Sequence, residues 1–337
     1  MFSRLGVDGE GWFPAGLTAH RGLHRLLPNH YLDLTTLEVR RFWPVKAIGT
    51  DPDPEAIVSE IIEVVQAQIE ALTHAPKKLG VALTGGHETR MLLACARPYL
   101  DKIDMVTVVG GDRHEIDSAL SRRIATDLGL SHITLRRQAA TDEQRDLFVR
   151  RGGHCNADSN SHYHPSIWPI AETHNLVGGV GGEVARAFYW RRDDQAGTHL
   201  SASALTARFG LAYEKAVSDA IEAWLQGLPQ MSAFEVMDLA YLEHRDGAWY
   251  ASQFYCDPIL VRFAPLLTSR IVELMVRLPP DWKRQSRLGH AVIARLWPEL
   301  ASYPYNSLGR WRDAVIQFQK VSSNPSILAK KLRKLLS

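Results

Sequence analysis

The pattern of apolar and polar positions in the first half of the chain alternates between strand and helix. Three short apolar runs rich in β-branched residues predict buried strands at Leu79–Leu83, Ile103–Val109 and His132–Leu135. Helices are predicted after the first two runs, one opening near Glu88 and one over Glu115–Leu128. This order, with its short connections, predicts a parallel sheet with right-handed crossovers and hence an α/β fold.

Helical periodicity also precedes and follows this region. A long helix is predicted over Pro52–Thr73, where Asp53 is a suitable N-cap and Pro54 stands at the first helical position. From Ser203 onward the pattern is helical, so we expect an all-helical C-terminal region. Its predicted helices are Ala204–Leu225, Ala233–Trp249, Leu260–Leu278 and Gly289–Trp297.

Composition narrows the class of protein. The 337 residues are 45% hydrophobic and 23% charged, which is typical of a soluble globular protein with one large or two modest domains. A net charge of +2 gives no case for nucleic acid or a membrane surface. Three widely separated cysteines argue against a disulfide framework and against a zinc site. Because no apolar run fits a signal peptide or a membrane span, we expect a cytoplasmic protein without stable membrane insertion.

The first predicted strand leads into TGGHETR at residues 84–90, where two glycines are followed by acidic and hydroxyl residues at a helix start. Glycines let the backbone approach an anion, free N–H groups at a helix N-terminus point at it, and Thr84 and Thr89 can donate hydroxyl groups. These residues alone fit a phosphate cradle and an ordinary strand–turn–helix corner equally well.

A second turn of the same kind follows a strand predicted at Asn175–Val180. Here the sequence GGVGGEVARAFYW, residues 178–190, combines four glycines with Glu183. In a parallel sheet, ligands bind at the carboxyl ends of the strands. We therefore expect Thr84–Thr89, Val108–Gly111 and the next loop at a strand end to surround a single cleft.

TGGHETR and GGVGGEVARAFYW resemble the two glycine-rich segments of the asparagine synthetase-like family, a group of N-type ATP pyrophosphatases in the PP-loop superfamily. The resemblance implies a parallel sheet of the adenine nucleotide alpha-hydrolase type, flanked by helices, with ATP and Mg²⁺ as cofactors. It implies Arg90 and Glu183 as catalytic residues, and Glu88 and Glu183 as metal ligands. The nucleotide would be bound by Thr84, Gly85, Gly86, Glu88, Thr89, Val108 and Gly178.

The chain departs from the family at three positions that the chemistry uses. Glu88 stands where the family has an aspartate, and Gly182 stands where it has a second acidic metal ligand. The segment SYPYNSLGRW, residues 302–311, contains no counterpart of the late lysine that stabilises charge in the family. Lys283, Arg310 or Arg312 could supply that charge, although an arginine cannot act as a base.

The resemblance also divides the chain. Residues 1–48 resemble the last hairpin and linker of an amidotransferase domain, with strands predicted at Tyr31–Leu34 and Glu38–Phe42. A hairpin packed on the main domain describes the same residues. Residues 49–320 correspond to the ATP-binding synthetase domain, and 321–337 form a basic amphipathic tail. Because the first segment is too short to build a glutaminase, we do not expect the chain to make ammonia from glutamine.

Several polar residues have two interpretations. For Asp112 and Asp117, capping and first-turn placement on the second helix is favoured over a role in the site. Between Arg151 and His174, a histidine-rich stretch favours a substrate-facing loop over a metal site, with a surface loop as the alternative. Its histidines are His154, His162, His164 and His174. Candidates for the acyl-acceptor side, or for structural ion pairs, are Glu243, Arg245 and Arg262.

The resemblance therefore predicts an ATP-dependent, AMP-forming ligase. It would activate a small-molecule or peptide carboxylate as an acyl-adenylate and form an amide with an amine, or with ammonia from a separate ammonia- or amine-supplying protein. One alternative is a degenerate nucleotide-binding or structural subunit of a biosynthetic complex without ligase activity. Another is sulfur insertion after ATP activation, against which the lack of paired cysteines counts.

Overall fold

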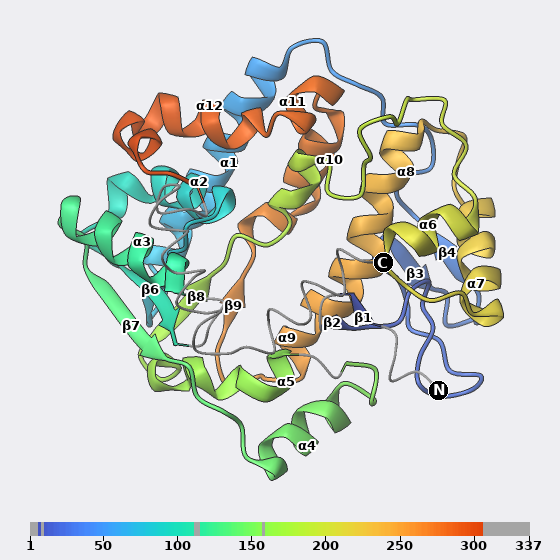
Figure 1. Cartoon of the computed structure of the whole chain (residues 1–337), viewed down its shortest axis with the longest axis horizontal. Coiled ribbons are helices and arrows are strands. Elements are labelled where there is room, and N and C mark those ends of the chain that lie inside the picture. Colours follow the sequence, from blue (N-terminus) through green and yellow to red (C-terminus); the bar gives the residue numbers. More distant parts are fainter. Residues whose placement is uncertain (1–5, 8–9, 111–114, 157–158, 306–337) are drawn as a thin grey trace, which may run out of the picture.

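The computed structural model describes residues 6–7, 10–110, 115–156 and 159–305 (Figure 1). Some expectations therefore lie outside the described residues, namely those on Asp112, Arg310, Arg312 and the tail at 321–337. Within the described part of the chain, no helix is both long and apolar enough to cross a membrane.

Five strands form one parallel sheet in the order β7-β6-β5-β8-β9, and two antiparallel pairs lie near the N-terminus. The strands are β1 (Gly6–Val7), β2 (Glu10–Gly11), β3 (His30–Leu32), β4 (Val39–Arg41), β5 (Lys78–Ala82), β6 (Ile103–Val109), β7 (His132–Arg136), β8 (His174–Val177) and β9 (Arg262–Phe263). The parallel sheet with flanking helices confirms the expected α/β fold class. Strands β3 and β4 pair as the predicted hairpin, with His30 opposite Arg41.

Helices connect and cover these strands (Figure 1). The α-helices are α1 (Pro54–Thr73), α2 (His87–Ala96), α3 (Glu115–Asp127), α4 (Asp142–Arg151), α5 (Ser159–Tyr163), α6 (Ala202–Arg208), α7 (Lys215–Gln226), α8 (Ala233–Ala240), α9 (Ser252–Tyr255), α10 (Ser269–Arg277), α11 (Pro280–Arg284) and α12 (Arg287–Leu296). Short 3₁₀ helices are η2 (Arg97–Tyr99), η3 (His164–Ile170), η4 (Gly182–Arg186), η6 (Pro265–Leu267) and η7 (Pro298–Ser302), and η5 (Tyr241–Tyr250) is a π-helix.

The two faces of the sheet are covered differently. Helices α1 and α2 contact β5, α3 contacts β6, and α12 packs on α1 and α2, so one face carries the main hydrophobic core. The other face is covered by η3 and the segment around Leu260, which form a smaller apolar cluster with Val106 and Leu135. The sheet is thus buried on both faces, as parallel sheets generally are.

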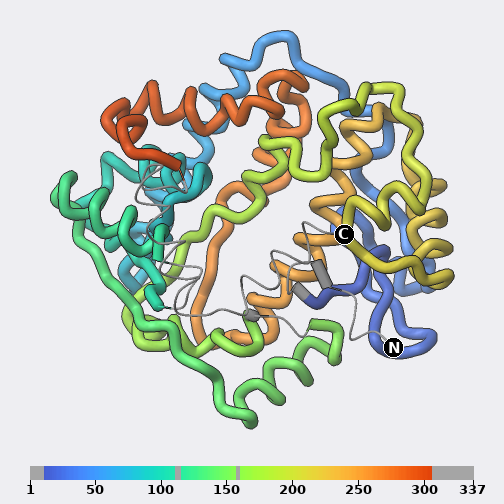
Figure 2. Tube along the Cα trace, in the orientation of Figure 1, coloured from blue at the N-terminus to red at the C-terminus, as the bar shows by residue number. Residues whose placement is uncertain are grey.

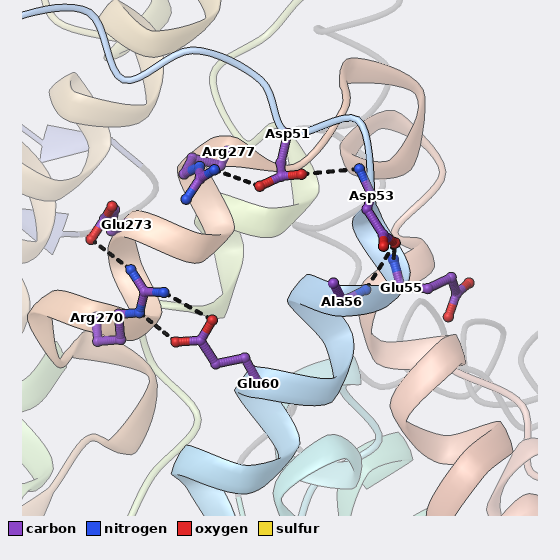
Figure 3. Close-up of polar contacts among 8 residues, drawn as sticks. All are labelled: Asp51, Asp53, Glu55, Ala56, Glu60, Arg270, Glu273 and Arg277. Atoms are coloured by element: carbon purple, nitrogen blue, oxygen red, sulfur yellow. Dashed lines mark hydrogen bonds and ion pairs between the residues drawn. The ribbon is translucent and has the colours of Figure 1, made fainter.

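Helix α1 begins where its sequence signals predict. Asp53 accepts hydrogen bonds from the N–H groups of Glu55 and Ala56, and Pro54 occupies the first turn. Figure 3 shows how the same end of α1 is joined to α10: Arg270 donates to both carboxylate oxygens of Glu60, at 2.5 and 2.9 Å. This ion pair joins the exposed sides of α1 and α10.

The C-terminal region differs from the all-helical expectation at one point. Residues 260–263 were expected to begin a helix, but Arg262–Phe263 form β9 beside β8, where the N–H of Gly178 donates to the carbonyl of Phe263 at 3.0 Å. Pro265 follows, and the helix starts only at Ser269. The edge of the sheet therefore takes a segment whose apolar run does not distinguish strand from helix.

Two long predicted helices are also divided. Gly210, at a φ of +67°, ends α6, so the expected helix over 204–225 becomes α6 and α7. The helix expected over 233–249 continues from α8 into the π-helix η5. In Figure 2 this helical part of the chain lies together with the N-terminal hairpin, to the right of the sheet. Glu243 of η5 joins them through Arg41 of β4 and Trp224 of α7.

Candidate functional site

The strand order reverses between β5 and β8, so a ligand-binding crevice is expected at the carboxyl ends of these two strands. From β5 the chain proceeds outward to β6 and β7 on one side, and it then returns to β8 and β9 on the other. Such a reversal is the position where open parallel sheets bind their ligands, at the carboxyl ends of the strands. The two glycine turns follow these two strands, as the sequence predicted, and they touch one another: a Cβ on Gly179 would lie 2.7 Å from Cβ of Glu88.

The first turn is organised by its own hydroxyl groups. Thr84 Oγ1 lies 2.9 Å from Thr89 Oγ1 and accepts a hydrogen bond from the N–H of Gly86 at 3.0 Å. Gly86 is the N-cap of α2 and supplies no side-chain cap. The N-terminus of α2 therefore receives no cap from its N-cap residue, and its N–H groups carry the partial positive charge that attracts anions.

Asp117 of α3 forms a hydrogen bond with the backbone of the first turn. Its Oδ1 accepts a hydrogen bond from the N–H of Gly85 at 3.0 Å. Asp117 does lie in the first turn of α3, but its carboxylate reaches across to a neighbouring loop. The favoured interpretation of this residue, as a residue of its own helix only, was therefore incomplete. The N–H group of Gly85, which could otherwise donate to a phosphate, is therefore already hydrogen-bonded.

Arg90 stabilises the same turn through hydrogen bonds to backbone carbonyl groups. Its side chain is fully buried, and its guanidinium donates to the carbonyl of Gly85 at 2.9 Å and to that of Tyr303 at 2.6 Å. It also hydrogen-bonds the carbonyl of Pro304 and lies over the Tyr305 ring, 4.0 Å from its centre. These contacts fix the shape of the turn, and the expected catalytic role of Arg90 stays a prediction.

Two positions of the second turn must be glycine, because the first turn packs closely against them. A Cβ on Gly182 would lie 2.5 Å from Cγ of Glu88, and a Cβ on Gly179 would also meet the backbone N of Thr89 at 3.1 Å. Glu88 thus fills the space that a side chain at position 182 would need. The two departures from the family pattern, a longer acid at 88 and a glycine at 182, are sterically complementary.

Glu88 and Glu183 converge, as expected, but Arg186 lies with them. The Nε of Arg186 hydrogen-bonds Oε1 of Glu88, and its Nη2 lies 3.8 Å from Oε1 of Glu183. Burial and then the charge of Glu183 raise the pKa of Glu88, against the opposing effect of Arg186. The positive charge that two neighbouring carboxylates require is supplied here by a guanidinium.

This arrangement does not fit a magnesium ion held between the two carboxylates. Arg186 already lies between the two carboxylates, and Gly182 offers no third ligand. Among the described residues, no group of three or more histidine, cysteine or acidic side chains could hold a metal ion. The role of Glu88 and Glu183 as magnesium ligands therefore stays a prediction, and one that would require Arg186 to move away.

The π-helix η5 forms a wall of the crevice. Tyr241 hydrogen-bonds Glu183, and the hydroxyl of Tyr250 would lie 3.6 Å from a Cβ on Gly178. Arg245 lies over the rings of Tyr241 and Phe188, at 5.5 and 4.4 Å. Because a π-helix bonds i to i+5, its turns are about one residue longer than those of an α-helix. Residues 241, 245 and 250 therefore share one face, whereas α-helical spacing would turn Tyr250 away.

The other candidates are placed as follows. Glu243 is fully buried and accepts hydrogen bonds from Asn29 and Arg41, which confirms the structural alternative for this residue. Lys283 is also fully buried and pairs with Asp238, so it cannot reach the crevice as the missing lysine. Arg262 is in an ion pair with Asp257.

The histidine-rich stretch divides between two ends of the sheet. His174 opens β8 at its amino end, where its Nε2 lies 2.9 Å from Oδ2 of Asp104. His164 lines a cavity at the opposite end, together with Val108. The expected substrate-facing role of this stretch stays a prediction, for which the position of His164 at a cavity is suitable. The sequence carried no signal for Asp104, because only the strand order brings 104 beside 174.

Sequence reasoning missed the residues that complete the crevice. Arg186 lies within the quoted second motif, and its spacing of three residues from Glu183 was the available signal for a pair on one helical face. Tyr241 and Tyr250 had no such signal, because their common face depends on π-helical geometry.

Comparison with known proteins adds little. No family model matches the chain, and no curated protein matches it. Among solved structures, an NMN synthetase from Francisella tularensis matches with 8% sequence identity and a TM-score of 0.28, over 71% of this chain and 96% of that one. This likeness is too weak to carry a structural or functional conclusion. The class of the protein therefore rests on its own sheet, turns and crevice.

Proposed function

We propose that the chain is an ATP-dependent, AMP-forming ligase, which activates a carboxylate as an acyl-adenylate and transfers the acyl group to an amine or to externally supplied ammonia. One observation carries the proposal: two glycine turns touch at the point where the strand order reverses, beside a helix N-terminus without a side-chain cap. Backbone N–H groups in this position suit the phosphates of a nucleotide.

The residues of the crevice would have distinct tasks. The N–H groups that open α2 and the hydroxyls of Thr84 and Thr89 would bind the terminal phosphates, and Gly178 would allow the nucleotide to approach β8. Arg186 would supply positive charge beside them. The site would thus act by positioning and by electrostatic stabilisation of developing negative charge.

The reaction would take two steps. An oxygen of the substrate carboxylate attacks the α-phosphorus, a P–O bond forms, and the bond to pyrophosphate breaks. The nitrogen of the neutral amine then attacks the acyl carbon, the bond between that carbon and the phosphate oxygen breaks, and AMP and one proton from the nitrogen are released. Activation is needed because a free carboxylate is a poor acyl donor.

Space for the carboxylate substrate lies next to the second turn. Leu267, whose side chain touches Gly181, and Tyr250, whose hydroxyl faces Gly178, also line a cavity of about 600 Å³. Phe42, Trp43 and Leu242 are among its other walls, so the cavity is largely apolar. A small-molecule or peptide carboxylate with an apolar body would suit it.

A second candidate function is supported by the state of the first turn. Asp117 takes the N–H of Gly85, and Lys283 is buried with Asp238. A chain with these features could bind a nucleotide, or serve as a structural subunit of a biosynthetic complex, without ligase activity.

Calorimetry with ATP, with and without Mg²⁺, tests the proposal. Gly86→Trp would block the N-terminus of α2, whereas Gly197→Ala is a matched control because a Cβ there meets nothing within 4 Å. We expect micromolar binding to the wild type and to the control, and none to Gly86→Trp. Release of pyrophosphate with a panel of carboxylates then distinguishes a ligase from a binding subunit. Absence of ATP binding at millimolar concentrations would refute the ligase and leave only the structural subunit.

A further inference from the structure

A separate cavity of about 250 Å³ lies on the face of the sheet that η3 covers. It opens at the carboxyl ends of β6 and β7, where Val108 and Arg137 contribute to its wall, and β9 contributes Arg262. Its remaining walls are Phe148, Asn160, Tyr163, His164, Ser166, Ile167, Gln253 and Asp257. The cavity thus combines charged, aromatic and aliphatic side chains from segments that are far apart in the sequence.

Asp257 is the most buried charged group of this cavity, with 1% of its surface exposed. Its Oδ1 accepts a hydrogen bond from the indole N–H of Trp168 at 3.0 Å. Its Oδ2 is in an ion pair with Arg262, 3.6 Å from Nη2 and just beyond hydrogen-bond distance, and it accepts no shorter hydrogen bond from the described residues. A buried carboxylate oxygen in this state has a strong preference for an additional N–H donor.

The positively charged side chains of the cavity can donate further hydrogen bonds to an acceptor. The Nε of Arg262 is buried without an acceptor in the described chain. Arg137 lies over the ring of Tyr163, 3.5 Å from its centre, and adds a second guanidinium. Burial lowers the pKa of His164 and so favours its neutral form. Among the described residues, two guanidinium groups against one carboxylate give the cavity an excess of positive charge, which suits a ligand that also carries an anionic group.

The other half of the lining is apolar. Val108, Phe148 and Ile167 face the cavity with hydrocarbon surface. Its volume is below the roughly 300–1,000 Å³ of sites for drug-sized ligands. The cavity therefore suits a small molecule with a charged end and a compact apolar end.

We propose that this cavity binds a small α-amino acid with an apolar side chain. Its ammonium group would donate to Oδ2 of Asp257, its carboxylate would accept from Nε of Arg262 and from Arg137, and its side chain would pack against Val108 and Ile167. A neutral planar ligand such as adenine would satisfy Asp257 but would leave the excess positive charge unpaired, so the observations favour the zwitterion.

The amino acid would be the amine substrate of the reaction. This role rests on the proposed ligase function, whereas binding to the cavity does not. Binding without ATP and failure of amide formation would refute the role and leave the site intact. Conversely, ATP binding without amino-acid binding would refute the site and leave the nucleotide crevice intact.

Matched ligands test the two charged contacts without any change to the protein. Calorimetry of the wild-type chain would compare L-valine with 3-methylbutanoate, which lacks the amino group, and with 2-methylpropylamine, which lacks the carboxylate. L-alanine and L-leucine would report the size of the apolar end. We expect one of these amino acids to bind, and its analogues to bind at least about tenfold more weakly, because each loses a charge-assisted hydrogen bond.

Asp257→Asn tests the same contact from the protein side. Asparagine preserves the shape and an acceptor for Trp168, and we expect it to weaken amino-acid binding by about tenfold to a hundredfold. Thermal unfolding identifies a variant that fails to fold, in which case the ligand series on the wild type decides. Equal binding of valine and 3-methylbutanoate would overturn the proposal. So would no binding of any amino acid at millimolar concentrations, or adenosine binding that depends on Asp257.

Discussion

The close fit of Glu88 against Gly182 makes a quantitative prediction. Gly182→Ala places a Cβ 2.5 Å from Cγ of Glu88, nearer than two carbon atoms can approach, and 3.1 Å from Cδ1 of Leu266. The side chain of Glu88 cannot simply turn away, because Arg186 holds its carboxylate. We expect Gly182→Ala to destabilise the protein by about 1–3 kcal/mol, as overpacking does in other cores.

Removal of Glu88 should relieve most of this strain. Glu88→Ala deletes Cγ, the atom that the new methyl group would meet, at the cost of the ion pair with Arg186. That cost is common to both chains that carry Glu88→Ala, so it cancels from the comparison. In the double variant, the effect of Gly182→Ala should fall by about 1–2 kcal/mol relative to its effect in the wild type.

Gly179→Ala is the matched control. Its Cβ would meet Cβ of Glu88 at 2.7 Å and the backbone N of Thr89 at 3.1 Å, and both atoms remain in Glu88→Ala. The cost of this substitution should therefore be equal in both backgrounds. The assay is urea unfolding at neutral pH for the six chains that make up the two cycles. If the cost of Gly182→Ala is the same with and without Glu88, to within about 0.5 kcal/mol, the two positions are not complementary.

Three further predictions concern buried charges. Burial, and next the charge of Arg186, lower the pKa of His87 to about 4. The unfolded chain therefore binds a proton at a pH where the folded chain does not, and the free energy of unfolding should decrease as the pH falls from 6.5 to about 4. His87→Gln should flatten the pH dependence of the unfolding free energy in that window. Burial raises the pKa of Asp104, but hydrogen bonds from His174, Lys78 and Ser131 outweigh it and lower the pKa to about 2. Asp104 should therefore contribute about 1–2 kcal/mol above pH 3.8 that is lost as the pH falls towards 2, and urea titrations of Asp104→Asn should lack this loss. Lys283→Met leaves Asp238 buried without its cation and should cost about 3–5 kcal/mol at pH 7 by urea unfolding, whereas Asp238→Leu with Lys283→Met should cost clearly less; an equal loss in both would show that packing, not charge, is decisive.

The local pattern of the sequence predicted much of the fold. Strand β6 has the predicted bounds of Ile103–Val109, and α1 is capped by Asp53 as its sequence indicated. Such features depend on residues within a few positions of one another. Periodicity, caps and glycine turns act over that range, so they can be read without knowledge of the partners.

Elements whose identity depends on a distant partner were predicted less well. Residues 262–263 form a strand only because the edge of β8 is available to them. The helix expected to end at Trp249 becomes a π-helix among aromatic residues that come from other segments. A short apolar run carries no information about which segment it will pair with.

The site shows the same division. The sequence alone determined two glycine turns after two buried strands, because the hydrophobic pattern, the glycines and the acids are local features. Only the tertiary structure decided that Glu88 would occupy the space at Gly182, that Arg186 would take both carboxylates, and that Asp257 would face a cavity beside Val108. The physical reason is that close packing and charge pairing depend on distances in space between residues such as Glu88 and Arg186, and the order of the strands in the sheet sets those distances.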